Sequence, residues 1–455
     1  MINFIPCDKV NKKFIYCFYY LTKEINEDVD ISNSPIEGDI NIFYGLKPTI
    51  KNSIYIPFEE INNAENVFEN YYDTEKYITF KPIENPYKNN QNIIEFKFDI
   101  ISSAAYMICC EEEYKLDKRD DKNRFLSDFS FRRENINRPL FDIYKRILID
   151  SIKNIDNNIQ QRDKKLEVLI THDVDNVDSR NIYILLHLIK DNIMKKRFIN
   201  ALKQLVYYSY KNRYNMFEKY LSIEKKYDVI SDFYFILGQK GRFGRRYSLD
   251  TIKDELQILK NNNNGIGMHT NYYYYNDYEK ILTDKNSLED YIQQDVIGCR
   301  NHYLRFNVPD SWEILKNINI KYDTTLGYSD NNGFRAGTCS SFVPFNLNSS
   351  SLIPIYEVPL VIMDILVMEN SLSYDEKFNK VKNILDYSKE YKGTISILWH
   401  LCVLENNDYK KMYLDILEYI KSIGGTFIDK GQVEAKFERE LKDINKLFSK
   451  LECVK

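Results

Sequence analysis

Four short strings of the sequence place a histidine at or just beyond the end of an apolar run, and three of them also contain carboxylate, hydroxyl or guanidinium groups. They are THDVD (171–175), GMHTNYY (267–273), CRNHYLR (299–305) and ILWH (397–400). Side chains delivered from successive strand ends meet at one edge of a parallel sheet, where hydrolytic sites are commonly built. The strings therefore predict a hydrolytic metal site assembled from distant segments. The fifth histidine, His187, lies in IYILLHLIK and is interpreted as part of a mostly apolar helix.

The carboxylates of the first string are Asp173 and Asp175, directly after the apolar run LEVLI. If the strand geometry persists, both point the same way. If the chain turns, one can bind a cation while the other stays free as a base. An isolated DxD pattern also fits an Asx-turn that closes a strand. The metal interpretation gains weight from His269, because a strand-end imidazole beside a carboxylate suits Zn²⁺.

The third and fourth strings add charged and acid–base groups. In a strand, Arg300 and His302 would share one face and Tyr303 would take the other. An arginine near a catalytic carboxylate orients it and lowers its pKa. A surface strand with alternating polar residues is the alternative. His400, after TISIL, could protonate a leaving group. Cys299 could be an activated thiol, but nothing in the sequence places a base beside it.

The segments that must hold these strings alternate between strand and helix beyond residue 165. Alternation of this kind predicts a parallel sheet covered by helices, and we expect an α/β fold, a distorted (β/α) barrel of seven or eight strands. A capping box at Ser373 and Glu376 marks one helix, and the stretch 181–227 is predicted to be helical and to cover the outside. The strands are expected at about 166–172, 232–237, 265–269, 298–304, 320–325, 353–362, 394–399 and 425–428.

The first part of the chain has a different pattern. We predict a small mixed α+β accessory domain over residues 1–160 and the barrel, with a C-terminal helix, over 161–455. In the first domain, strands are predicted at KFIYCFYYL, INIFYG and SIYIPF, and helices at FDIISSAAYMICCEEEY and 138–156. The polar stretch KNIDNNIQQRDKK (153–165) is the predicted linker.

Bulk composition narrows the class of protein. The net charge of −4 comes from interspersed charges, so nucleic acid is not an expected partner. Eight cysteines occur without a CxxC pair, which favours reduced thiols. The sequence begins without a signal-peptide pattern, and its longest apolar run, around 182–189, is too short for a membrane span. We therefore expect a cytoplasmic protein without a membrane span. The oligomeric state is left open.

Taken in order, the four strings resemble those of the polysaccharide deacetylase superfamily, the NodB-homology domain of carbohydrate esterase family four, over about residues 165–430. An uncharacterised bacterial branch that has THDVD and an N-terminal accessory domain is the most similar. The segments 322–339, with Asp323 and Arg335, and 354–364, with Glu357 and Asp364, are similar to that branch. The resemblance implies a base at Asp173, metal ligands at Asp175 and His269, orienting residues at Arg300 and Tyr303, and an acid at His400.

One departure from the family pattern concerns the metal. Tyr273 stands where the family has its second histidine, so one imidazole ligand is missing. Catalytic zinc sites usually have three protein ligands. His302 is the first candidate for the missing ligand, and His172 is the second. If neither serves, the site is impaired.

The resemblance implies a divalent metal ion, most of all Zn²⁺, with Co²⁺, Ni²⁺ or Mn²⁺ as alternatives. It also implies a metal-dependent hydrolase that removes N-acetyl or O-acetyl groups from a sugar, a glycan or a glycan precursor. Two alternatives remain. The chain could be a catalytically impaired carbohydrate-binding descendant, which Tyr273 motivates, or a metal-assisted amidohydrolase that acts on a non-sugar amide.

Overall fold

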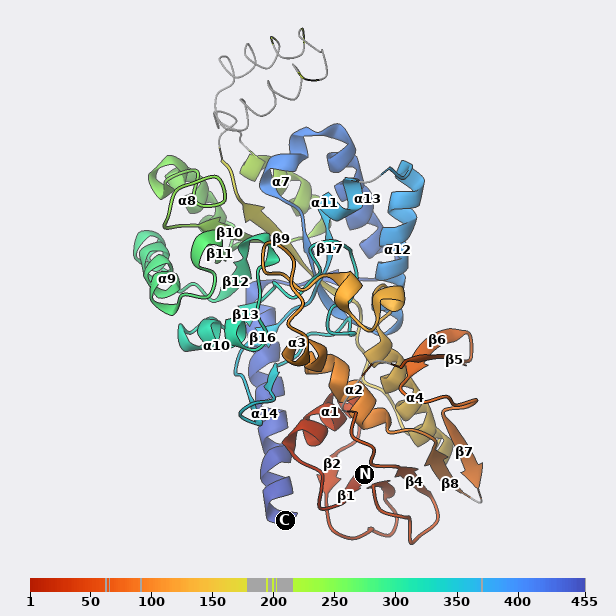
Figure 1. Cartoon of the computed structure of the whole chain (residues 1–455). Helices are drawn as coiled ribbons and strands as arrows, with labels where there is room; N and C mark the ends of the chain where they lie inside the picture. Colours follow the sequence, from red (N-terminus) through yellow and green to blue (C-terminus); the bar gives the residue numbers. More distant parts are fainter. Residues whose placement is uncertain are drawn as a thin grey trace.

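The structure, a computed structural model, describes residues 1–177 and 216–454 apart from 62, 63, 65, 91 and 370, and between 178 and 215 it describes only 194, 199 and 202. Most of the helical stretch predicted at 181–227, and His187 with it, therefore lies outside the described residues. The part that is described is α7, Met216–Glu224. Two large sheets organise the chain, one in the first hundred residues and one between residues 167 and 427 (Figure 1).

The second sheet carries the four histidine strings. Its order is β16-β13-β12-β11-β10-β9-β18-β17, with β19 also paired to β9, and all its pairs are parallel. The order ends at β16 and β17, so strand pairing within the described chain leaves the barrel open there. The predicted distorted (β/α) barrel is confirmed. The strands are β9 Glu167–Val174, β10 Asp232–Ile236, β11 Gly265–Thr270, β12 Gly298–Asn301, β13 Tyr322–Asp323, β16 Tyr356–Glu357, β17 Leu360–Met363, β18 Thr394–Leu398 and β19 Thr426–Phe427.

Three predicted strands are too long, and one of them, 320–325, is reduced to the two residues of β13. The segment 353–362 is divided into β16 and β17, because Pro359 between them has no N–H for a sheet hydrogen bond. The segment 298–304 ends as a strand at Asn301, because Tyr303 and Leu304 have positive φ angles of 61° and 53°. The predicted alternation of Arg300, His302 and Tyr303 across a strand is therefore wrong.

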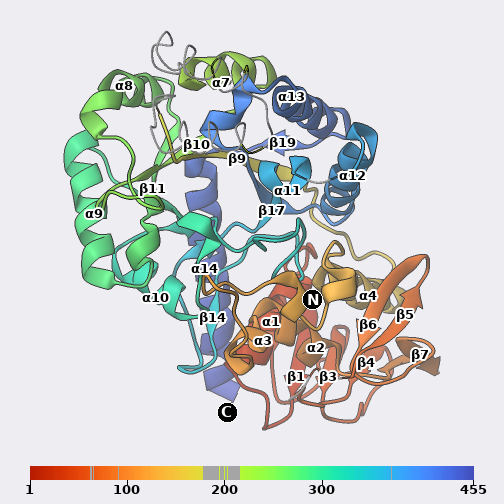
Figure 2. The same cartoon turned by 45° about the horizontal axis from the view of Figure 1, so that its top comes forward.

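Helices form a ring outside the barrel sheet (Figure 2). In α12 the capping box predicted at Ser373 and Glu376 is present. None of the helices in the described part of the chain has the length and hydrophobicity that a bilayer span requires. The helices that follow α7 are α8 Lys253–Asn261, α9 Tyr278–Ile292, α10 Asp310–Asn317, α11 Asp364–Met368, α12 Tyr374–Glu390, α13 Asn407–Ser422 and α14 Lys430–Val454.

The N-terminal sheet has the order β2-β1-β3-β4-β8-β7, in which only the β7–β8 pair is antiparallel. The helices α1, α2, α3 and α4 and the hairpin β5–β6 accompany it. The bounds are β1 Ile2–Pro6, α1 Lys12–Thr22, β2 Val29–Ile31, β3 Ile40–Tyr44, β4 Ser53–Ile56, β5 Phe68–Tyr72, β6 Glu75–Thr79, β7 Tyr87–Asn90, β8 Ile93–Phe96, α2 Ile100–Ile108, α3 Glu111–Lys115 and α4 Leu140–Ile155.

The strand predicted at KFIYCFYYL is wrong, because these residues lie in α1. Every residue of α1 from Lys13 to Thr22 is buried, so neither face has a polar stripe that would reveal a helical period. The side chain of Asn11 caps the helix by accepting a hydrogen bond from the backbone N–H of Lys13 (3.0 Å). The predicted division of the chain at residue 160 stays a prediction.

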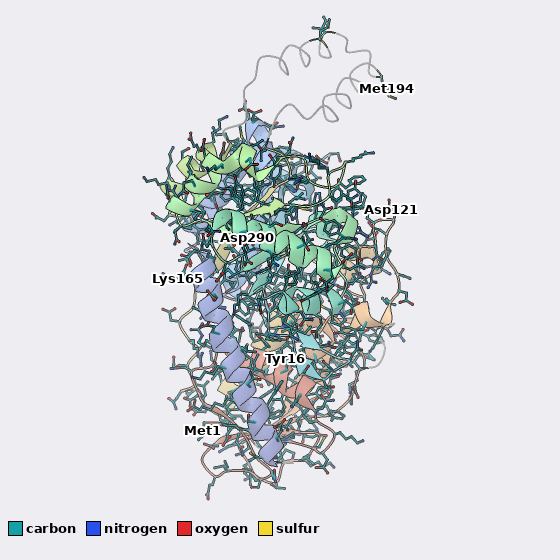
Figure 3. The ribbon with its side chains drawn as sticks, turned by 90° about the vertical axis from the view of Figure 1, so that its left-hand side faces the viewer. Met1, Tyr16, Asp121, Lys165, Met194 and Asp290 are labelled. Atoms are coloured by element: carbon teal, nitrogen blue, oxygen red, sulfur yellow. The ribbon has the colours of Figure 1, made fainter. Side chains whose placement is uncertain are left out.

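Contacts between the N-terminal part and the barrel are buried and polar. The long α14 passes from the barrel, near Lys165, along the N-terminal part to below Met1 (Figure 3). Its Glu440 accepts hydrogen bonds from the Tyr20 hydroxyl (3.0 Å) and the Lys23 ammonium (2.8 Å). On another side, the guanidinium of Arg335, in the loop after β13, donates two hydrogen bonds to the carboxylate of Glu113 (2.8 and 2.6 Å). The two parts are therefore joined by desolvated charges.

Removing Glu113 should destabilise the whole protein. The Glu113→Ala substitution leaves the Arg335 guanidinium buried without its carboxylate, which should lower the free energy of unfolding by about 3–5 kcal/mol. Denaturant unfolding followed by circular dichroism measures this. The matched control is Glu452→Ala, which removes an exposed partner of Lys12 and should cost less than about 1 kcal/mol. Equal, small effects of the two substitutions would contradict the importance of the buried pair.

Candidate metal and catalytic site

The polar residues of the four strings leave neighbouring strands at one edge of the barrel sheet. Asp173 is in β9 and Asp175 follows it, His269 is in β11, and Arg300 is in β12. His302 directly follows β12 and Tyr303 comes next to it, whereas His400 follows β18 after one intervening residue, Trp399. Because all these strands are parallel, their carboxyl ends lie together. The structure thus brings segments more than 200 residues apart to one place.

Three side chains form a group with the spacing of metal ligands: Asp175, His269 and His302. The Nε2 atoms of His269 and His302 each lie 3.4 Å from Oδ1 of Asp175. The candidate ligand atoms all lie within 4.8 Å of one another. Two imidazoles and one carboxylate are a donor set typical of catalytic zinc.

The two imidazoles are oriented by backbone carbonyls. Nδ1 of His269 lies 2.8 Å from the carbonyl oxygen of Arg300, and Nδ1 of His302 lies 3.0 Å from that of Phe243. A carbonyl oxygen only accepts, so each Nδ1 donates, and each Nε2 is free to bind a cation. In addition, Nε2 of His269 and Oδ1 of Asp175 are buried without a hydrogen-bond partner. A divalent cation would satisfy both atoms, so these residues fit a metal ion.

The three candidate metal ligands shift one another's pKa values. Burial raises the pKa of Asp175, but His302 and His269 outweigh burial and hold this pKa well below its usual range. Burial lowers the pKa of His269, but Asp173 and Asp175 outweigh it, so this pKa is raised. For His302, burial is the dominant effect and its pKa is lowered. The neutral imidazole of His302 is the form in which histidine binds a metal.

Asp173 lies beside the metal-ligand group, next to His269 and Arg300. Its Oδ2 is 3.4 Å from Nε2 of His269, and its Oδ1 is 3.6 Å from Nε of Arg300. The Arg300 guanidinium is fixed in turn by hydrogen bonds to the hydroxyls of Thr171 (2.7 Å) and Thr324 (3.0 Å). Oδ1 of Asp173 has no hydrogen-bond partner. An oriented carboxylate with a free oxygen can accept a proton.

His400 lies on another side of the group and is paired with Asp364, the first residue of α11. Its Nδ1 is 2.8 Å from Oδ1 of Asp364, and its Nε2 is 4.0 Å from Oδ2 of Asp175. Burial lowers the pKa of His400, but the charge and hydrogen bond of Asp364, with Asp175 and Asp173, outweigh it and raise the pKa to about 10. His400 is therefore protonated at neutral pH and can act as an acid.

Tyr303 belongs to an aromatic rim around the group. Its ring lies against Phe243 (5.4 Å between centroids), Tyr272 (5.3 Å) and His302 (4.7 Å). Its backbone is left-handed, with φ 61°, which costs free energy for a side chain of this size and is found most often at functional sites. The R-x-x-Y spacing therefore brings Tyr303 to the site through a strained turn after the strand.

His172, the second candidate for the missing ligand, does not join the group, and this prediction is corrected. Its Nε2 is 2.7 Å from Oε1 of Glu224, and its Nδ1 is 2.7 Å from the carbonyl oxygen of Trp399. Successive side chains of a strand point to opposite faces, so His172 packs behind β9 while Asp173 faces the other histidines.

Other candidates have structural positions. Burial raises the pKa of the Cys299 thiol well above its usual value, which argues against a reactive thiolate. Glu357 accepts hydrogen bonds from Nε1 of Trp312 (2.8 Å) and the backbone N–H of Leu326 (3.1 Å), and burial raises its pKa well above the usual range. Asp323 accepts a hydrogen bond from the Thr325 hydroxyl (2.6 Å). These carboxyls support the loop after β13.

Two features of the site were not predicted from the sequence. One is Asp364 as the partner of His400, although an acidic residue at the end of a strand next to β18 is a usable signal. The other is the loop 238–246, whose Phe243 carbonyl orients His302. Tyr273 holds this loop, because its hydroxyl accepts a hydrogen bond from the backbone N–H of Phe243 (3.4 Å). A backbone carbonyl has no sequence signature.

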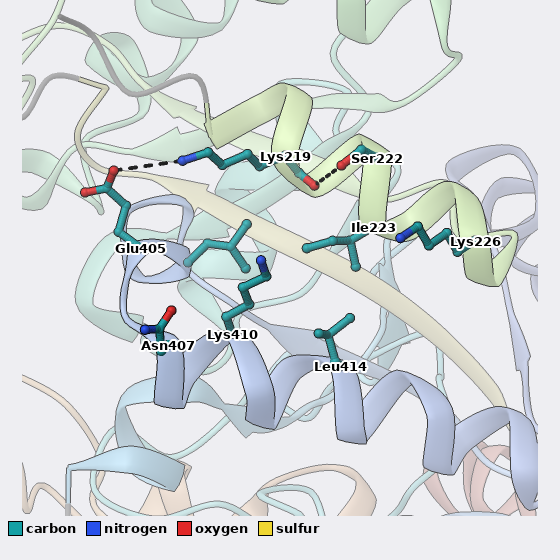
Figure 4. A pocket seen from close by; sticks show the side chains of 9 residues that line it. Lys219, Ser222, Ile223, Lys226, Glu405, Asn407, Lys410 and Leu414 are labelled. Atoms are coloured by element: carbon teal, nitrogen blue, oxygen red, sulfur yellow. Dashed lines mark hydrogen bonds and ion pairs between the residues drawn. The ribbon is translucent and has the colours of Figure 1, made fainter. Parts of the chain in front are cut away.

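A cavity of about 460 Å³ lies away from this site, between α7 and the start of α13. Figure 4 shows Lys219 and Ser222 of α7, and Lys226 just beyond its end, opposite Lys410 and Leu414 of α13. None of the candidate catalytic or metal-binding residues lines it. Its lysines are at the surface, and we assign it no role.

Comparisons with known proteins found one family model and several similar solved structures. The model of a family of unknown function, DUF7033, matches residues 4–157, about a third of the chain. No curated protein sequence matches. One similar solved structure is described as a putative polysaccharide deacetylase from Mycobacterium smegmatis; it is 15% identical, the match covers 62% of this chain and 93% of that chain, and the TM-score is 0.42. The PuuE allantoinase is 14% identical, with 60% of this chain and 90% of that chain covered and a TM-score of 0.42. BA3943 of Bacillus anthracis, described as a CE4 family pseudoenzyme, is 12% identical, with 59% of this chain and 66% of that chain covered and a TM-score of 0.33. At these TM-scores nothing about function follows.

The two histidines proposed as alternative ligands should behave oppositely on substitution. His302→Ala removes one of three ligands and should weaken zinc binding by more than about 100-fold, since loss of an outer-shell partner alone costs about 10–100-fold. His172→Ala should leave zinc affinity within about threefold but lower the free energy of unfolding by about 2–4 kcal/mol, because a buried imidazole is removed and Glu224 loses one of its three buried hydrogen-bond partners. Competition with a chelating dye measures the affinity. Equal losses of zinc from both variants would contradict the assignment.

Proposed function

We propose that the chain is a metal-dependent hydrolase that removes an acetyl group, most of all an N-acetyl group, from a sugar or glycan. The observation that carries the proposal is the group Asp175, His269 and His302, which meets beside a free carboxylate, Asp173, and a protonated imidazole, His400. This arrangement and the four strings together support a member of the polysaccharide deacetylase superfamily.

Asp175, His269 and His302 would hold the divalent ion, most of all Zn²⁺. When bound, the ion supplies Lewis-acid chemistry, which polarises an amide or ester carbonyl and favours deprotonation of water. Each protein ligand has its own support: the carbonyls of Arg300 and Phe243 fix the two imidazoles, and burial excludes bulk water from them. A supported ligand set of this kind needs little rearrangement on binding.

Asp173 is the proposed base. Nε of Arg300 lies 3.6 Å from Oδ1 of Asp173 and Nε2 of His269 lies 3.4 Å from Oδ2, so the carboxylate is held in one orientation. It would take the proton of the attacking water. A backbone N–H near Tyr303 would donate to the developing oxyanion.

His400 is the proposed acid. Asp364 accepts hydrogen bonds from Nδ1 and from the backbone N–H of His400 (2.8 and 2.7 Å), so the ring is fixed with Nε2 directed at the group. Proton transfer from Nε2 to the departing amine or alcohol would complete the reaction. Asp173 and His400 thus have opposite proton-transfer roles on opposite sides of the proposed metal ligands.

The impaired descendant is the less favoured alternative. It rests on Tyr273, which replaces an imidazole, but His302 offers an imidazole at the same group. A metal-assisted hydrolase of a non-sugar amide would use the same residues. Substrate profiling separates it from the proposal.

Substitution of the two aspartates should separate chemistry from metal binding. Asp173→Asn keeps the size of the side chain but removes the base, so acetate release from N-acetylated sugars should fall by at least about 100-fold with zinc still bound. Asp175→Ala should lose zinc and activity together. Acetate release is measured by a coupled assay and zinc by elemental analysis. Full activity in either variant would defeat these roles.

Asp364→Asn should shift the pH dependence. The substitution removes the largest influence that raises the pKa of His400, so this pKa should fall from about 10 toward its ordinary value. The acid works only while protonated, so the alkaline limb of the kcat profile should move to lower pH. An NMR titration of the His400 ring checks the pKa directly. An unchanged alkaline limb, with the His400 pKa lowered, would show that His400 is not the acid.

A further inference from the structure

Cationic side chains from two different parts of the chain lie beside the aromatic rim, and we call this part of the surface the mouth of the site. The loop 238–246, GQKGRFGRR, has four cationic residues and no acidic one. Its Phe243 carbonyl contacts His302, so the loop lies directly against the proposed metal ligands. Arg242 lies over the Phe243 ring, with 5.2 Å between the guanidinium carbon and the ring centroid. The loop therefore presents cations next to the aromatic rim.

Arg246 lies beside Arg242 on this loop. Its Nη2 donates a hydrogen bond to the backbone carbonyl oxygen of Arg242 (2.6 Å), the residue that precedes Phe243. Arg242 and Arg246 therefore belong to the part of the loop that contacts His302.

The N-terminal part of the chain adds a third cation. In Figure 3, Asp121 lies at the level of the barrel, far from Met1 and Tyr16. The neighbouring Lys122 ammonium is 5.5 Å from the centroid of the Tyr303 ring. Asn123 and Arg124 fasten this segment, because they donate hydrogen bonds to the Tyr275 hydroxyl (2.5 Å) and the Tyr303 carbonyl (3.5 Å).

These three cations have no ion-pair partner among the residues that the structure describes. Arg124 has its own carboxylate, Asp120, at 2.7 Å. For Lys122, Arg242 and Arg246, no carboxylate of the described residues is within 4.0 Å. All three side chains are partly or fully exposed. Exposed charges of one sign beside a site attract ligands of the opposite sign.

From this we infer that the acylated sugar carries an anionic group, a phosphate or a carboxylate, which Lys122, Arg242 and Arg246 bind at the mouth. The inference rests on the proposed function. The rings of Phe243, Tyr272 and Tyr303 would line the path of the sugar between this anionic group and Asp173, since aromatic faces pack against apolar sugar faces. The N-terminal part is then a component of the substrate site.

Binding of small probes to the full-length Asp173→Asn protein loaded with zinc tests the inference without turnover. The probes are N-acetylglucosamine, which is neutral, N-acetylglucosamine 1-phosphate, and N-acetylmuramic acid, which has a carboxylate. At low salt at least one anionic probe should bind at least about tenfold more tightly than the neutral one, and added salt should narrow the gap. The comparison of the two anionic probes identifies the preferred group.

Charge-removing variants locate the binding. Lys122→Gln and the double variant Arg242→Gln/Arg246→Gln should each lower the affinity for the anionic probe by roughly two- to fivefold for every charge removed. The affinity for the neutral probe should not change. The matched controls are Lys240→Gln on the same loop and Lys118→Gln on the same N-terminal segment, both exposed, which should have no effect. Equal binding of neutral and anionic probes, or equal losses in the controls, would overturn the inference.

The outcome is separable from that of the proposed function. If the wild-type protein releases acetate equally well from neutral and anionic sugars, and the variants of Lys122, Arg242 and Arg246 do not change release from the anionic sugars, the hydrolase stands and the inference fails. If the anionic probes bind through Lys122, Arg242 and Arg246 but the wild-type protein releases acetate from none of the probes, the anion-binding site stands and the proposed hydrolase fails.

Discussion

The register of the parallel sheet is the constraint on which the candidate site depends. Thr171 is paired with Leu398, and His269 with Arg300. The carboxyl ends of β9, β11, β12 and β18 are therefore aligned along one edge of the sheet. A slip of one residue in a strand turns every side chain of that strand to the other face. His172 and Asp173 illustrate this, because they are neighbours in β9 but belong to different environments, one facing Glu224 and the other His269.

Burial makes the site costly in the absence of a cation. Two carboxylates, Asp173 and Asp175, lie close together in a region from which water is largely excluded, and Nε2 of His269 is buried without a partner. An unsatisfied buried polar group costs about 1–3 kcal/mol. Arg300 and the Asp364–His400 pair offset part of this cost. A bound dication would satisfy the remaining atoms, which explains why the fold keeps them unpaired.

Much of the barrel and part of the site could be predicted from the sequence. The strands β10, β11 and β18 are buried apolar runs of ordinary length, and the predictions agree with them within about two residues. Helix α1 was missed because it is buried on all sides and lacks an amphipathic period. The choice between His172 and His302 depends on a turn with positive φ after β12 and on a backbone carbonyl, and neither leaves a readable pattern of side chains.

Tyr273 and His302 are connected in the structure, which bears on whether the missing imidazole impairs the site. Tyr273 packs so closely on the loop 238–246 that a Cβ at Gly241, with φ +155°, would lie 2.6 Å from its hydroxyl, and a Cβ at Gly244 would lie 3.1 Å from its ring. Only glycine allows this approach. The loop so held places the Phe243 carbonyl on Nδ1 of His302. Tyr273 therefore helps to orient His302 through this loop, and under the proposed function Tyr273 and His302 would form a single compensated arrangement.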